Sequence, residues 1–215
     1  PKLTLRLFDT LVASVLLYGV ETWGYQKFDK IIELVHTSFL RRFLRVRKST
    51  PLLALYGESG RLPLLYSGKF RILRYWTKLL YLPENRYVKV VYKDALDLFH
   101  AKPEYSPWCS FIFKVLNQIS MHGHFEFHSI PDPNEFYKVA ITRLFEKYKK
   151  DWKTEILTLT SLDSYIKFKP NHGLEVYLSS VTDKRHLAAL SRFRLRSHNL
   201  AIETGRHNRR IPREQ

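Results

Sequence analysis

Apolar residues recur at intervals of three and four through most of this sequence. Examples are Phe8, Leu11, Val12, Val15 and Leu16, and later Leu65, Ile72, Trp76 and Leu79. This spacing places the apolar side chains on one side of a helix, whereas a half-buried strand needs strict alternation. We therefore expect an all-α fold, or nearly so: a helical bundle with a basic, turn-rich C-terminal segment.

Helix boundaries follow from the same pattern and from capping residues. Helices are expected over about 8–19, 27–45, 51–56, 63–81, 85–99, 107–119, 134–157 and 184–195. Thr50 and Asp183 are the expected N-caps, and Gly19 and either Gly57 or Gly60 are the expected terminators. Residues 165–169 alternate and predict a short extended segment.

Three of these helices have a predicted buried face. The helix over 63–81 is expected to bury Leu65, Ile72, Trp76 and Leu79 and to present Arg71, Arg74 and Lys78 outward. The helix over 27–45 is expected to bury Phe28, Ile31, Ile32, Val35, Phe39, Phe43 and Leu44, and to present Lys30, Thr37, Arg41, Arg45 and Lys48 on another face. The last helix is expected to bury Leu187, Leu190 and Phe193. Outward stripes that are rich in arginine would then remain free for binding.

Positive charge is concentrated in two regions. The chain has 36 Lys and Arg against 20 Asp and Glu, a net charge of +16. Ten basic residues and one acid lie between Arg41 and Lys78, and nine basic residues and one acid lie between Lys184 and Arg213. Residues 79–160 are nearly balanced. Single-sign regions favour a polyanionic partner over a surface that is merely soluble, so we expect nucleic acid.

The predicted contact residues form three groups. They are Arg41, Arg42, Arg45, Arg47 and Lys48; then Arg71, Arg74 and Lys78; and finally Arg192, Arg194, Arg196, His198, Arg206, Arg209 and Arg210. Phosphate binding requires positive donors without exact base geometry, which clustered arginines supply. For Tyr18, Glu21, Trp23 and Trp76 a structural role is favoured over ligand contact.

The residues offer little catalytic chemistry. No Gly-rich phosphate loop is present, and no pair of neighbouring carboxylates could hold two metal ions. His122, His124 and His128 could bind a metal, but their spacing is unlike that of common zinc sites, and we interpret them as loop histidines. Cys109 is interpreted as a small buried apolar residue.

Membrane insertion is not expected. The longest apolar run, Leu11 to Val20, is too short to cross a bilayer. The single cysteine cannot form an internal disulfide, which fits a reducing compartment. The expected location is therefore intracellular, in the nucleus, the cytoplasm or both.

Two stretches of the chain have specific, ordered sets of residues. The first comprises Leu7 to Val12, Leu17-Tyr18-Gly19-Val20-Glu21-Thr22-Trp23-Gly24, His36-Thr37-Ser38-Phe39-Leu40-Arg41-Arg42, Arg45 to Pro51, Tyr56 to Leu64 and Arg71 to Trp76. The second comprises Phe193-Arg194-Leu195-Arg196-Ser197-His198-Asn199-Leu200 and Ile202 to Arg206. In this order, the two stretches resemble the region that follows the polymerase palm in LINE-type (non-LTR) retrotransposon reverse transcriptases. Residue 59 departs from the family pattern, since Ser59 stands where relatives often have leucine.

The resemblance implies three consecutive parts. They are a thumb-like helical region over 1–83, a helical middle region over 84–182 and a basic RNA-binding segment over 183–215 that ends before the family's Cys/His cluster. The implied partners are RNA and DNA, as a template–primer duplex or element RNA, and the rest of a parent polymerase chain. The segment itself would be non-catalytic and without a cofactor, whereas the parent RNA-directed DNA polymerase would use Mg²⁺.

Other functional hypotheses remain open. A helical protein-interaction scaffold derived from a degenerate retroelement predicts an exposed apolar patch. A metal nuclease predicts metal-dependent cleavage that requires His124. Membrane attachment through residues 11–20 predicts liposome binding.

Overall fold

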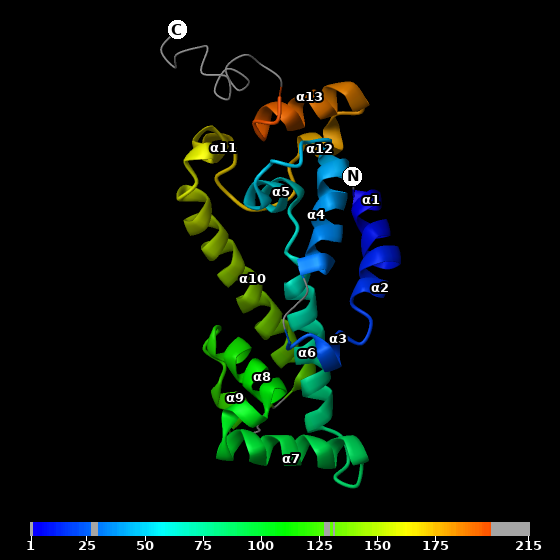
Figure 1. The fold of residues 1–215 in the computed structure, drawn as a ribbon, viewed down its shortest axis with the longest axis vertical. Helices are drawn as coiled ribbons and strands as arrows, with labels where there is room; N and C mark the ends of the chain where they lie inside the picture. Colours follow the sequence, from blue (N-terminus) through cyan, green and yellow to red (C-terminus); the bar gives the residue numbers. More distant parts are fainter. Residues whose placement is uncertain (1, 27–29, 127–129, 131, 199–215) are drawn as a thin grey trace. The chain divides into compact units, whose positions relative to one another are not determined.

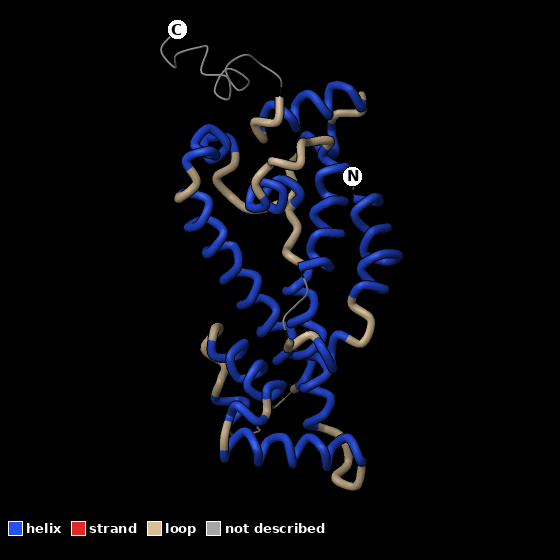
Figure 2. The backbone as a smooth tube through the Cα atoms, viewed as in Figure 1, coloured by secondary structure: helices blue, strands red, loops and turns tan. Residues whose placement is uncertain are grey.

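The computed structural model of the chain describes residues 2–26, 30–126, 130 and 132–198, and shows helices joined by loops (Figure 1, Figure 2). No β-strand occurs in this part of the chain. Ser59 and Leu174 form an isolated antiparallel β-bridge. The predicted all-α class is confirmed.

The elements follow the chain in this order: α1 (Lys2–Leu7), the π-helix η1 (Phe8–Ala13), α2 (Ser14–Leu16), α3 (Val20–Trp23), α4 (Lys30–Leu44), α5 (Leu52–Ser59), α6 (Leu64–Leu80), α7 (Tyr87–Ala101), the 3-10 helix η2 (Pro103–Tyr105), α8 (Pro107–Asn117), α9 (Gly123–Glu126), α10 (Pro133–Leu157), the 3-10 helix η3 (Thr160–Leu162), α11 (Asp163–Phe168), α12 (Tyr177–Ser180) and α13 (Lys184–Arg194).

Several expected boundaries are confirmed. Helices α6, α7, α8 and α10 lie close to their predicted positions. Asp183 caps α13, because its Oδ1 accepts the amides of Arg185 at 2.7 Å and His186 at 2.9 Å. Gly60, with a φ of +65°, ends α5. Of the two expected terminators it is Gly60 that is used, and Gly57 lies within the helix.

Two local predictions are wrong. Residues 165–169 are not extended, because Asp163–Phe168 form α11 and Tyr165 is completely buried. Its hydroxyl group approaches the Ala54 carbonyl (3.3 Å) and donates to Glu58 (3.1 Å). Thr50 does not cap α5; Pro51 is the N-cap, and the buried Thr50 hydroxyl has no hydrogen-bond partner in the described part of the chain.

The predicted buried face of α4 is largely wrong: Leu44 is buried as expected and Ile32, Phe39 and Phe43 are half-buried, but the other described positions are exposed. The helix buries His36, Thr37, Leu40 and Leu44, whereas Ile31, Leu34 and Val35 are exposed. Two polar atoms have partners within the helix: His36 Nδ1 lies 3.0 Å from Glu33 Oε1, and the Thr37 hydroxyl donates to the Leu34 carbonyl at 3.2 Å. The buried His36 Nε2 has no hydrogen-bond partner among the described residues. Phe28 lies outside the described residues.

The N-terminal helical region has the expected position but not the expected face. Phe8 is buried and stacks on Phe39 with ring centroids 4.3 Å apart. Leu11, Val12 and Val15 are exposed instead of buried. Within the described residues, no helix combines the length and the apolar character that a bilayer crossing requires.

The chain divides into two compact units that do not follow the three expected consecutive parts. Unit 1 contains the described residues of Pro1–Phe8, Glu33–Arg61 and Lys149–Gln215. Unit 2 contains those of Asp9–Ile32 and Leu62–Tyr148. The boundaries expected at 83/84 and 182/183 are therefore replaced by a division in which segments distant in sequence share a unit.

Unit 2 is built around an aromatic core. Trp76 on α6 is completely buried and donates from Nε1 to the Tyr92 hydroxyl at 3.0 Å. Its ring contacts those of Phe125 and Phe136. Cys109 is buried in the same core, and burial raises the pKa of its thiol. The structural interpretations of Trp76 and Cys109 are thereby confirmed.

Unit 1 is built around α5, whose residues from Ala54 to Ser59 are all buried. Trp152 of α10 donates from Nε1 to the Leu53 carbonyl at 2.8 Å. Gly57 makes this packing feasible, because a Cβ at this position would lie 2.4 Å from Trp152 Cζ2. The α5 helix thus packs against α10, and its Glu58 contacts Arg194 of α13, the helix that carries part of the candidate site.

Candidate nucleic-acid interface

Helices α4 and α13 end in the same backbone motif, with an arginine at the position that usually holds glycine. Arg45 has a φ of 56°, and the Val46 amide donates to the Arg41 carbonyl at 3.0 Å. Arg196 has a φ of 51°, and the Ser197 amide donates to the Arg192 carbonyl at 2.7 Å. A side chain in this left-handed conformation costs about 1 kcal/mol relative to glycine. Such strain is often found at functional sites.

The two helix ends are joined by hydrogen bonds. Arg192 Nε donates to the Arg45 carbonyl at 2.8 Å, and Arg45 Nη1 donates to the Lys184 carbonyl at 3.1 Å. The Arg47 amide donates to the Ser197 hydroxyl at 2.7 Å, across a separation of 150 residues. The structure therefore brings members of the first and third predicted groups into one site.

An open cavity of about 600 Å³ lies at this junction. We name it the arginine pocket, and its lining residues are Arg45, Val46, Arg47, Ala189, Arg192, Phe193, Ser197 and His198. Phe193 is 52% exposed, and its ring stacks on that of His198 with centroids 5.7 Å apart and planes inclined by 27°. The pocket combines guanidinium donors with an accessible aromatic ring.

The arginines of the pocket keep their charge available. Arg45, Arg47 and Arg192 are exposed, and none forms an ion pair with a carboxylate in the described ranges. Arg45 and Arg192 are instead oriented by backbone carbonyls. A guanidinium has five N–H donors, so these contacts leave others for a ligand. The result is a pre-oriented positive surface.

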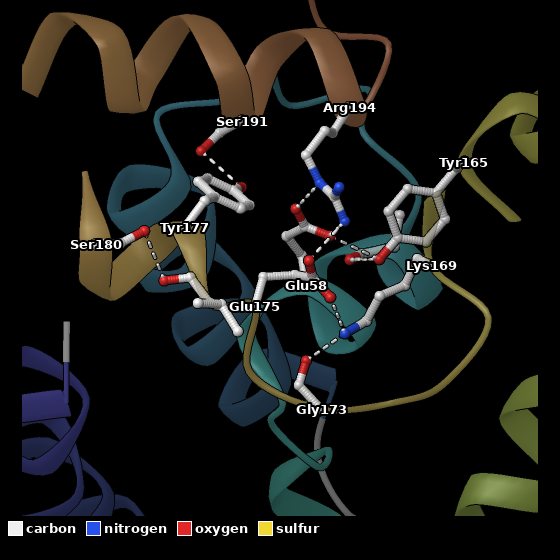
Figure 3. Close-up of polar contacts among 11 residues, drawn as sticks. Glu58, Tyr165, Lys169, Gly173, Glu175, Tyr177, Ser180, Ser191 and Arg194 are labelled. Atoms are coloured by element: carbon white, nitrogen blue, oxygen red, sulfur yellow. Dashed lines mark hydrogen bonds and ion pairs between the residues drawn. The ribbon is translucent and has the colours of Figure 1, made fainter. Parts of the chain in front are cut away.

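Arg194 departs from the prediction of nucleic-acid contact. Its Nε lies 2.6 Å from Oε1 of the completely buried Glu58, and its Nη2 lies 2.8 Å from Oε2 of Glu175 (Figure 3). Its side chain is only 14% exposed. The guanidinium is thus committed to the interior of unit 1, because a buried carboxylate there requires a cation.

The surroundings of this ion pair are polar but enclosed. Lys169 binds both Glu175 and the Gly173 carbonyl, and the Tyr177 hydroxyl lies 3.0 Å from Ser191 Oγ (Figure 3). Burial opposes the charged form of Arg194, but the hydrogen bond and charge of Glu58, together with Glu175, raise its pKa. Burial and the Glu58 charge raise the pKa of Tyr165 and of Tyr177. These contacts therefore connect α5, α11, α12 and α13 within unit 1.

The remaining predicted residues of unit 1 fall into different environments. Arg42 and Lys48 are exposed, and Arg196 and His198 are half-buried. Arg41 is also half-buried, and its Nε has no hydrogen-bond partner in the described structure. Arg206, Arg209 and Arg210 lie outside the described residues.

The second predicted group lies in unit 2. Arg71, Arg74 and Lys78 line a cavity of about 490 Å³ together with Glu21, Thr22 and Tyr75. Arg74 and Lys78 are exposed, whereas Arg71 is half-buried and donates to the Leu17 carbonyl at 2.9 Å. The Arg74 guanidinium also lies 5.9 Å from the centre of the Tyr137 ring. The predicted outward stripe on α6 is confirmed for Arg74 and Lys78, but not for Arg71.

Sequence reasoning missed the role of α13 in shaping the arginine pocket. It assigned Leu187, Leu190 and Phe193 to a buried stripe, but α13 buries Ala188 and Ser191. Phe193 is 52% exposed, whereas its neighbour Arg194 is directed inward by its ion pair with Glu58. The sequence feature that could have indicated this ion pair is Glu58, the single acid within a basic region.

The histidine cluster is only partly described. His124 packs edge-on against Phe136, with ring centroids 5.1 Å apart, and His122 lies 6.3 Å from Phe113. His128 lies outside the described residues. Among those that are described, no group of three His, Cys, Asp or Glu side chains has the geometry of a metal site.

The chain has no detectable relative among known proteins: no protein-family model matches it, and neither a curated protein nor a solved structure shows detectable similarity.

Proposed function

We propose that this chain binds nucleic acid through its phosphate backbone, with the arginine pocket as the principal contact. The observation that carries this proposal is the convergence of Arg45, Arg47 and Arg192, which are exposed and have no carboxylate partner in the described ranges. Two of them, Arg45 and Arg192, are also oriented by backbone carbonyls. Guanidinium groups of this kind bind phosphate oxygens and release counterions.

The charge of the whole chain supports the same role. A net charge of +16 attracts a polyanion over long range, and the pocket provides a place where that attraction becomes contact. Arg74 and Lys78 on unit 2 offer further phosphate contacts. These contacts carry no base sequence information, so binding is expected to depend weakly on sequence.

The resemblance to the post-palm region of LINE-type reverse transcriptases suggests the biological form of this role. On that basis the ligand is a template–primer duplex or element RNA held for a parent RNA-directed DNA polymerase. Chemistry would belong to the palm of that parent, with its Mg²⁺, and this chain would contribute binding. Two of the resembling stretches, 56–64 and 193–200, contain the partners Glu58 and Arg194.

The test is a fluorescence-anisotropy titration of the purified chain with labelled single-stranded RNA, duplex DNA and an RNA–DNA hybrid of equal length. Three phosphate contacts predict that affinity for a single strand falls roughly 20-fold between about 50 and 200 mM salt. Binding to none of the three nucleic acids at the lower salt concentration would contradict the proposal.

A protein-interaction role is a second candidate, favoured by an apolar surface on unit 2. Tyr87, Val88, Val91 and Leu98 of α7 are exposed, at 80%, 45%, 47% and 50%. A cavity of about 270 Å³ adjoins them, lined mainly by apolar residues that include Leu79, Tyr92 and Trp108. Sedimentation velocity of the chain and of Val91→Glu would detect self-association through this face. A concentration-independent monomer in both cases would count against self-association.

A further inference from the structure

We infer that the arginine pocket accepts an unpaired nucleobase on the Phe193 ring while its arginines hold the adjoining phosphates. The pocket would therefore prefer single-stranded to duplex nucleic acid. This inference rests on the proposed function and adds to it the form of nucleic acid that this site binds.

The first observation is the exposed aromatic ring. Phe193 is 52% exposed, although the next two residues are directed inward: Arg194 is 14% exposed and Leu195 is 1% exposed. Its ring stacks on His198, so the two rings form a short aromatic stack that borders the pocket. Every base has a flat π-face, so an accessible aromatic ring binds unpaired bases with little regard to sequence.

The second observation is the position of the donors around that ring. Arg192 precedes Phe193 on α13, and Arg45 and Arg47 line the same cavity from the end of α4. Base and phosphate of one nucleotide are covalently linked, so a site for both needs donors beside the ring. The hydrogen bonds of Arg192 to Arg45 and of Arg45 to Lys184 fix these guanidinium groups before a ligand arrives.

The third observation is the shape of the site. The cavity volume of about 600 Å³ lies in the range typical of sites for small molecules, which suits a single nucleotide unit. Inside a duplex, away from its two ends, both faces of each base are covered by neighbouring bases, and only base edges and phosphates remain accessible. A ring at the wall of this pocket can therefore stack on a base from a single strand but not on one inside a duplex.

The experiment compares three ligands of equal phosphate number: an oligothymidylate, an abasic oligomer that lacks the bases, and a blunt duplex. It uses Phe193→Leu, which removes the flat ring but keeps an apolar side chain, and Phe193→Tyr, which keeps the ring. Phe168→Leu is a matched control, because Phe168 is 51% exposed on α11 of the same unit.

Phe193→Leu is expected to weaken oligothymidylate binding about fivefold or more and to leave the abasic oligomer and the duplex unchanged. Phe193→Tyr and Phe168→Leu are expected to bind all three ligands like the wild type. An equal effect of Phe193→Leu on all three ligands, or no effect on any, would overturn the inference and leave phosphate binding intact. Failure of the wild type to bind any ligand would overturn the proposed function and this inference with it.

Discussion

Arg192 Nε donates to the Arg45 carbonyl at 2.8 Å, although 147 residues separate the two. This hydrogen bond ties the end of α4 to α13 and places two exposed guanidinium groups beside one cavity. Arg194, two positions further along, points inward to Glu58. Neighbouring arginines of one helix thus have opposite roles, one available to a ligand and one structural.

The pair Arg192 and Arg194 allows a direct comparison. Arg194→Met should lower the free energy of unfolding by about 3 kcal/mol, because it leaves the buried Glu58 carboxylate without its cation. Arg192→Met should change it by less than about 1 kcal/mol, since that side chain is exposed. Urea unfolding followed by circular dichroism measures both. Equal losses of stability would show that the role of Arg194 is misassigned.

Arg45 is expected to strain the backbone and to contribute to nucleic-acid binding. Arg45→Gly removes a side chain from the left-handed conformation, which should contribute about 0.5–1 kcal/mol to the free energy of unfolding, less the contribution of the lost hydrogen bond to the Lys184 carbonyl. The same substitution should weaken nucleic-acid binding. Ser120→Gly is the control, because Ser120 has a φ of 55° and is not among the residues that line the pocket. It should gain similar stability with unchanged affinity. Weaker binding in both variants, or in neither, would contradict the assignment of Arg45.

Gly57 tests the packing that supports the site. Gly57→Ala should destabilise the chain by about 1–3 kcal/mol, because the new Cβ would lie 2.4 Å from Trp152 Cζ2 and 2.9 Å from the Tyr165 hydroxyl. Gly173→Ala should be nearly neutral, since no atom lies within 4 Å of a Cβ there. Thermal unfolding of the two variants checks this contrast, which would disappear if α5 were not packed against α10 and α11.

His172 makes stability depend on pH. Burial lowers its pKa to about 4, so the folded state holds it neutral, while in the unfolded chain it has its ordinary value of 6.5. Between these values the unfolded state binds more protons, so stability is lost as pH falls through 6.5 toward 4. From pH 7 to pH 5 this loss is about 2 kcal/mol.

The variant His172→Gln isolates this contribution. Glutamine retains an N–H donor for the Arg61 carbonyl, which His172 Nε2 approaches at 3.2 Å, but does not titrate. Urea midpoints at the two pH values should therefore fall less for the variant than for the wild type. Identical pH dependence in the two proteins would show that His172 is not the titrating group.

Local patterns were sufficient for the helical class and for most helix positions. The spacing of Ile72, Trp76 and Leu79 correctly identified the buried side of α6, because that helix is apolar on one side only. In α4 the same reasoning failed. Ile31, Leu34 and Val35 are apolar yet exposed, and polar His36 and Thr37 are buried with partners within the helix. Periodicity cannot distinguish two apolar faces, nor foresee a local hydrogen bond.

The candidate site was predictable only in its parts. Charge clustering identified Arg45, Arg47 and Arg192 as exposed candidates, which the structure places together. It could not separate them from Arg194, because the distinction depends on Glu58, a residue 136 positions away. Likewise, the helical spacing of Phe193 does not reveal that this ring is exposed while the adjacent Arg194 pairs with Glu58.

The salt dependence of binding tests the electrostatic basis of the proposal most directly. The measurement is the slope of log Kobs against log salt concentration for a single strand, in the wild type and in the triple variant Arg45→Gln, Arg47→Gln and Arg192→Gln. The control replaces Lys150, Lys153 and Lys167 by glutamine, three exposed lysines of the same unit.

The arginine variant should lose affinity and its slope should become shallower by about 2, near 0.7 for each lost contact. The slope of the lysine variant should differ from that of the wild type by much less than the slope of the arginine variant does. Equal slopes in the wild type and the arginine variant, or an equal change in both variants, would contradict the arginine pocket as the phosphate-binding site.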